Sequence, residues 1–156
     1  MPESFDMDAA HRHFSAEFFN QTWTLLDVDV HSEEDIEVMV DLAHASRLHW
    51  RQRKDRSQKS MTIGAWQLSR VYSIAGRPNE ALRYATESLD IARGEDVGVF
   101  YEAYGHEAVA RAAASLGDSD TARLHIRAAR GLLDAIEQPG DRAAVAADLD
   151  SISFSR

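Results

Sequence analysis

The chain has 156 residues, no cysteine and a formal net charge of −9. This length fits one domain with a sizeable core, and the lack of cysteine excludes disulfides, thiolate metal sites and thiol nucleophiles. A general nucleic-acid binder needs a basic surface, which this acidic chain does not predict. The chain has no apolar run long enough to predict a membrane span, and its acidic start over residues 1–6 is unlike a secretory signal. We therefore expect a cytoplasmic protein without nucleic-acid or membrane partners.

The charge is unevenly spread along the chain. Residues 1–46 carry a net charge of −10, residues 47–60 carry +5, and the remainder carries −4. A cluster of like charge at a helix end is favoured when its sign opposes the helix dipole. The basic stretch is therefore interpreted as a helix-end cluster that balances the acidic N-terminal part, with an acidic partner as the alternative.

Apolar residues recur at helical spacing along the chain, and no stretch shows the sustained alternation of a strand. Phe14, Phe18 and Leu25 form one such stripe in the first segment. Helix-start and helix-end signals divide the rest, with Ser32 and Asp118 as N-caps and glycines such as Gly76 as ends. We expect helices over about 8–26, 32–51, 62–75, 78–93, 97–116, 118–136 and 142–152. Residues 54–60 are polar and are predicted to be a loop.

Residues 65–84 contain a spaced pattern of large, small and turn residues. Along the first helix of this segment the pattern consists of Trp66, Leu68, Tyr72 and Gly76. The second helix opens with Glu80-Ala81-Leu82 and has the small residue Ser88 late in its length. This pattern resembles one tetratricopeptide repeat, in which small residues let two antiparallel helices approach and large residues fill the groove between hairpins.

A weaker second copy follows in the chain. The turn recurs as Leu116-Gly117-Asp118, and Ala122 and Ala129 occupy the small-residue positions of the next helix. The two turn glycines are 41 residues apart, compared with about 34 in the family. The resemblance implies a single all-α domain over 1–156, of tetratricopeptide-like stacked antiparallel hairpins. It has about seven helices, with hairpins at about 8–53, 62–93 and 97–136 and a capping helix at about 140–153.

The resemblance also implies a concave groove lined by the first helix of each hairpin. It places seven residues there, which are Ile63, Trp66, Arg70, Ser73, Tyr104, Glu107 and Arg111. Arg70 and Arg111 occupy equivalent positions on neighbouring helices, so two guanidinium groups would grip a carboxylate or phosphate, with Trp66 as an aromatic anchor. The alternative is that Arg70 pairs with Glu107 and that Trp66 belongs to the core.

The seven histidines raise the question of a metal site. His44 and His49 are five residues apart and point to different sides of a helix, whereas Glu102 and His106 share a face. A catalytic zinc site usually has three protein ligands, so these pairs favour ordinary packed or surface histidines and no cofactor. The sequence also lacks a glycine-rich phosphate loop and a serine-nucleophile motif.

These observations favour a non-catalytic protein- or peptide-binding helical-repeat module, an adaptor or scaffold whose partner carries an acidic group. One alternative is a small-molecule or metal-binding helical-bundle enzyme that uses His44, His49, Glu102 or His106. Another alternative is a homodimeric structural protein that buries its aromatic first helix.

Overall fold

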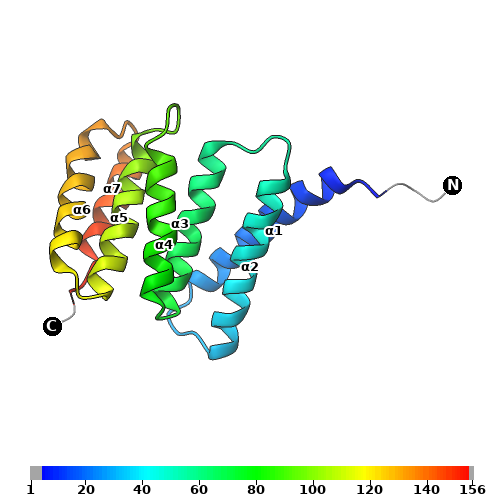
Figure 1. The fold of residues 1–156 in the computed structure, drawn as a ribbon, viewed down its shortest axis with the longest axis horizontal. Coiled ribbons are helices and arrows are strands. Elements are labelled where there is room, and N and C mark those ends of the chain that lie inside the picture. Colours follow the sequence, from blue (N-terminus) through cyan, green and yellow to red (C-terminus); the bar gives the residue numbers. More distant parts are fainter. Residues whose placement is uncertain (1–4, 155–156) are drawn as a thin grey trace.

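The computed structural model describes residues 5–154, and all of its regular elements are helices (Figure 1). In chain order they are α1 (Met7–Leu26), α2 (Glu33–Gln52), α3 (Gln58–Ile74), α4 (Pro78–Ala92), α5 (Val99–Ser115), α6 (Ser119–Leu132), the 3-10 turn η1 (Leu133–Ala135) and α7 (Pro139–Asp150). The predicted all-α class is therefore confirmed. None of the helices within this range has the length and apolarity that a bilayer crossing requires.

The helices are stacked in chain order, and consecutive helices from α1 to α6 pack against each other. Figure 1 shows α1 and α2 at one end of the stack and α6 and α7 at the other. In addition, α3 contacts α5, and α5 contacts α7. The odd-numbered helices α3, α5 and α7 thus form a continuous layer, which is the layer that carries the site described below.

Most helix ends follow the predicted cap signals. The Ser32 side chain accepts from the backbone N–H of Asp35, and the Asp35 carboxylate accepts from the backbone N–H of Ser32, which is a complete capping box. Gly76 and Gly117 follow α3 and α5 with φ of 68° and 80°, a left-handed conformation in which a side chain is strained.

The stretch 54–60, predicted as a loop, was assigned wrongly in its second half. The α3 helix begins at Gln58, because Ser57 and Ser60 form a second capping box. The Ser60 N–H donates to the Ser57 hydroxyl oxygen over 3.1 Å, and the Ser57 N–H donates to the Ser60 hydroxyl oxygen over 3.0 Å. The polar residues thus make the first turn of the helix. Similarly, α7 begins at Pro139, since proline suits the first helical position.

Small residues allow α5 to lie at the centre of the stack. Its fully buried alanines include Ala103, Ala110 and Ala112. The closest approach is at Gly105, where an added Cβ would lie 2.8 Å from the Cα of Leu89 on α4. A Cβ at this point would meet backbone, which cannot move aside without separating the two helices.

We expect Gly105→Ala to lower the free energy of unfolding by about 1–3 kcal/mol, because overpacking forces α4 and α5 apart. The matched control is Gly131→Ala in α6, where an added Cβ would meet no described atom within 4 Å. That control should raise stability by up to about 1 kcal/mol through helix propensity alone. Urea unfolding followed by circular dichroism measures both, and equal effects of the two substitutions would contradict the close approach.

Candidate functional site

An aromatic cavity lies between α1, α3 and α5. It has a volume of about 320 Å³. Its lining consists of Phe19, Trp23, Thr62, Ile63, Trp66, Ser88, Phe100, Tyr101 and Tyr104. The Trp66 ring packs 5.5 Å from the ring of Trp23 and edge-to-face at 5.4 Å from the ring of Tyr104. These contacts hold the walls in place, so the cavity is bounded by large side chains fixed against one another.

A second cavity, of about 420 Å³, lies beside the first, toward the C-terminal ends of α3 and α5. Its lining consists of Trp23, Leu26, Asp27, Arg70, Ser73, Ile74, Arg111 and Ser115. Trp23 borders both cavities. The aromatic cavity therefore adjoins, at Trp23, a cavity that contains two guanidinium groups, and we call the second one the arginine pocket.

A third cavity, of about 290 Å³, extends the first in the opposite direction. It includes Trp50 and Lys59, and it shares Phe19 and Ile63 with the aromatic cavity. The three cavities together follow α3 from Ser57 to Ile74, and we call them the α3 groove. At 1.5 Å of rise per residue this groove is on the order of 25 Å long.

A buried ion network lies beneath the arginine pocket. The side chain of Glu107 is only 1% exposed, and its carboxylate accepts from Nε of Arg111 over 2.7 Å. Nη1 of Arg70 lies 3.6 Å from the same carboxylate oxygen. A buried carboxylate is tolerated only when it is paired in this way. Glu107 therefore lies below the groove surface and fixes the two arginines that border it.

The α7 helix supplies a second carboxylate to the network. Asp148 accepts from Nη2 of Arg70 over 3.1 Å and from the Tyr104 hydroxyl over 3.0 Å. Nη2 of Arg111 donates to the backbone oxygen of Asp148 and to the hydroxyl oxygen of Ser151. Two positive and two negative side chains thus balance. Among the described residues, Nε of Arg70 and Nη1 of Arg111 make no hydrogen bond, so both guanidinium groups retain donors for a ligand.

Six of the seven residues expected in the groove border its cavities, and Arg70 and Arg111 are brought together by Glu107. The alternative pairing of Arg70 with Glu107 also occurs, although Arg111 makes the shorter contact. Sequence reasoning missed two contributions from the first hairpin, Phe19 and Trp23, and one from the capping helix, Asp148. It also missed Phe100 and Tyr101, which lie within the second repeat copy. The spacing of Phe19 and Trp23 indicated a shared helix face but not which helix it meets.

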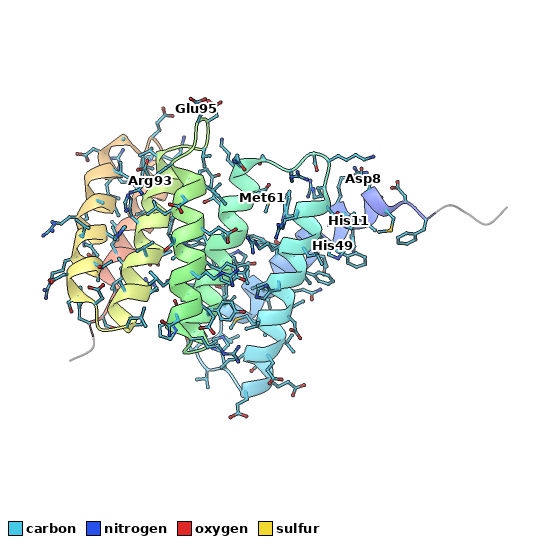
Figure 2. The ribbon with its side chains drawn as sticks, viewed as in Figure 1. Asp8, His11, His49, Met61, Arg93 and Glu95 are labelled. Atoms are coloured by element: carbon cyan, nitrogen blue, oxygen red, sulfur yellow. The ribbon has the colours of Figure 1, made fainter. Side chains whose placement is uncertain are left out.

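The histidines considered for metal binding have separate partners. His44 lies 2.8 Å from the Tyr72 hydroxyl. Figure 2 shows His11 and His49 facing each other between α1 and α2, with 2.9 Å between their Nδ1 atoms. No group of three or more metal-ligating side chains occurs in residues 5–154. The four residues of the metal hypothesis, which are His44, His49, Glu102 and His106, therefore do not converge on one point.

A second histidine pair joins α5 to α6. Nδ1 of His106 lies 2.8 Å from Nδ1 of His125, so one ring must donate its proton and the other must accept it. Burial, reinforced by His125, lowers the pKa of His106 from 6.5 to about 4. Burial also lowers the pKa of His125. Both rings thus remain neutral in the folded chain at neutral pH.

Comparison with known proteins offers no relative from which to transfer a function, since no family model, curated protein or solved structure matches the chain.

We expect acid to destabilise the fold through His106. Its folded pKa of about 4 lies below the unfolded value of 6.5, so the stabilising contribution is complete above pH 6.5 and is lost as the pH falls toward 4. The loss amounts to about 3 kcal/mol across that window. His106→Gln should flatten this part of the stability profile, measured by urea unfolding between the two pH values. His13→Gln on exposed α1 surface is the control, and an equal flattening there would refute the assignment.

Proposed function

We propose that the chain is a non-catalytic protein- or peptide-binding module, an adaptor or scaffold of tetratricopeptide-like stacked hairpins. In this proposal the α3 groove holds the partner. Support comes from two independent features, which are the repeat pattern at 65–84 and the aromatic cavity with its adjoining arginine pocket. The observation that carries the proposal is that the aromatic cavity and the arginine pocket adjoin each other at Trp23.

The aromatic cavity suits an apolar anchor side chain of the partner. Binding energy in protein complexes is concentrated where a few large side chains fill desolvated pockets. The cavity volume of about 320 Å³ is at the small end of the range for ligand sites, which fits one side chain better than a large cofactor. The Trp66 ring packs against the rings of Trp23 and Tyr104, which holds all three in place. These side chains would therefore lose little conformational entropy when a partner binds.

The arginine pocket suits an acidic group on the same partner. The remaining donors of Arg70 and Arg111 favour a carboxylate as the ligand, because guanidinium groups bind carboxylates with paired hydrogen bonds. An extended chain advances about 3.3 Å per residue, so the α3 groove would hold roughly seven or eight residues of a peptide. The proposed ligand is therefore an extended segment with an apolar side chain and an acidic group a few residues apart.

The aromatic cavity also has little means of proton transfer. The titratable residues among its lining are Tyr101 and Tyr104. Burial and the neighbouring Asp148 raise the pKa of Tyr104 well above its ordinary value, so this phenol remains protonated at neutral pH. A general acid or base works best with a pKa near the working pH. The lining thus favours binding over catalysis.

A displayed random-peptide library, selected on the wild-type chain, tests the proposal. We expect peptides with an apolar residue near an acidic one to be enriched. Ile63→Lys places a charge at the cavity wall and should weaken their binding by at least tenfold in calorimetry, and Arg70→Gln should weaken acidic peptides in particular. The matched control is Leu124→Lys, at an exposed position on α6.

The absence of any enriched peptide would contradict the proposal. Enriched peptides that bind Ile63→Lys and Arg70→Gln as tightly as the wild type would also contradict it. Circular dichroism of each variant shows whether a lost affinity reflects the groove or a lost fold.

A further inference from the structure

The N-terminal end of the stack exposes an apolar face formed by α1 and α2. We call it the terminal face, and it consists of the exposed Met7, Val38 and Leu48 and the half-buried Phe14 and Phe18. Helical spacing places Phe14 and Phe18 on a different side of α1 from Phe19 and Trp23, which border the groove. The Phe14 and Phe18 rings stack on each other at 5.3 Å, and Leu48 is 58% exposed.

The opposite end of the stack is closed differently. There α7 buries Val145 and Leu149 against Ile136, so the last hairpin presents a capping helix to solvent. No described element covers α1 and α2 in the same way. Stacked helical repeats need a polar outer surface at each end to remain soluble. The terminal face therefore lacks a cap that the other end possesses.

The charges around the terminal face are separated along α2. Residues 27–41 at its N-terminal end carry seven acidic and no basic residues, whereas residues 47–60 at its C-terminal end carry a net charge of +5. A helix of this size is about 30 Å long, which is several Debye lengths at physiological salt. The two ends of one chain therefore cannot neutralise each other. Ion pairs within the described residues involve Arg47 and Arg53 of the basic stretch and none of these seven acids.

We propose that the terminal face binds the terminal face of a second copy of this chain. A two-fold axis that lies in the plane of the interface, perpendicular to α2 at its midpoint, places the two faces against each other with their α2 helices antiparallel. The acidic end of each copy then lies against the basic end of the other, and a two-fold interface of this kind is self-complementary by construction. The second copy supplies both the apolar cover and the opposite charge that the face lacks.

The available area is sufficient for a stable pair. Two adjacent helices about 30 Å long and about 10 Å wide offer about 600 Å² per copy. The resulting total of about 1,200 Å² is at the lower limit for specific interfaces. Because the α3 groove is bordered by other residues of α1, this pairing leaves it open. The dimer proposal can therefore be tested independently of the peptide-binding proposal.

Sedimentation velocity of the full chain over a micromolar concentration series tests the dimer. We expect the wild type to be dimeric and Leu48→Glu to be monomeric. The control is Leu124→Glu on α6, because Leu124 is 56% exposed and lies at the far end of the stack. It should leave the dimer intact. A wild type that stays monomeric at high micromolar concentration would overturn the proposal, as would equal behaviour of the two leucine variants.

A charge swap tests the antiparallel orientation. Reversing Glu34 and Glu37 to Lys should weaken the dimer at least tenfold, and so should reversing Arg51 and Lys54 to Glu. Combining both reversals should restore it, since each end again meets its opposite. If the combined variant is weaker than either alone, the two-fold arrangement is wrong. Circular dichroism confirms that each variant is folded.

Discussion

The buried carboxylate of Glu107 organises the layer formed by α3, α5 and α7. A charge with 1% exposure is stable only if cations surround it, and Arg70 and Arg111 meet that need from two helices. Their excess charge is balanced in turn by Asp148 of α7, which also accepts from Tyr104. The network therefore couples the position of the C-terminal helix to the arginine pocket and to one wall of the aromatic cavity.

The other constraint on the site is the small-residue packing of α5. Gly105 lets α4 and α5 approach closely, and Tyr101 and Tyr104 of α5 border the aromatic cavity next to this contact. The first hairpin completes the opposite wall with Phe19 and Trp23. One side of α1 thus lines the α3 groove, and another side forms part of the terminal face. A partner peptide and a second copy of the chain would therefore use separate surfaces of the same helix.

Local signals in the sequence were sufficient for the helices but not for the site. Caps at Ser32 and Asp118 and the turn glycines marked most helix ends, because these preferences act over a few residues. The Ser57–Ser60 capping box was missed, since two serines in a polar stretch also suit a loop. Local patterns could not predict contacts between residues that are far apart in the sequence. Asp148 binds Arg70 across 78 residues, and His11 contacts His49 across 38 residues. The repeat resemblance did bring Arg70 and Arg111 together.

Fluorine NMR of the fluorotyrosine-labelled chain tests the central claim, which is that the aromatic cavity is where a partner binds. The chain has four tyrosines, of which Tyr101 and Tyr104 line the cavity, whereas Tyr72 and Tyr84 stack on each other at 5.6 Å within the core. When a library-selected peptide is added, the account predicts shifts in the signals of Tyr101 and Tyr104 and unchanged signals of Tyr72 and Tyr84. Saturating binding that leaves the two cavity signals unmoved would contradict it.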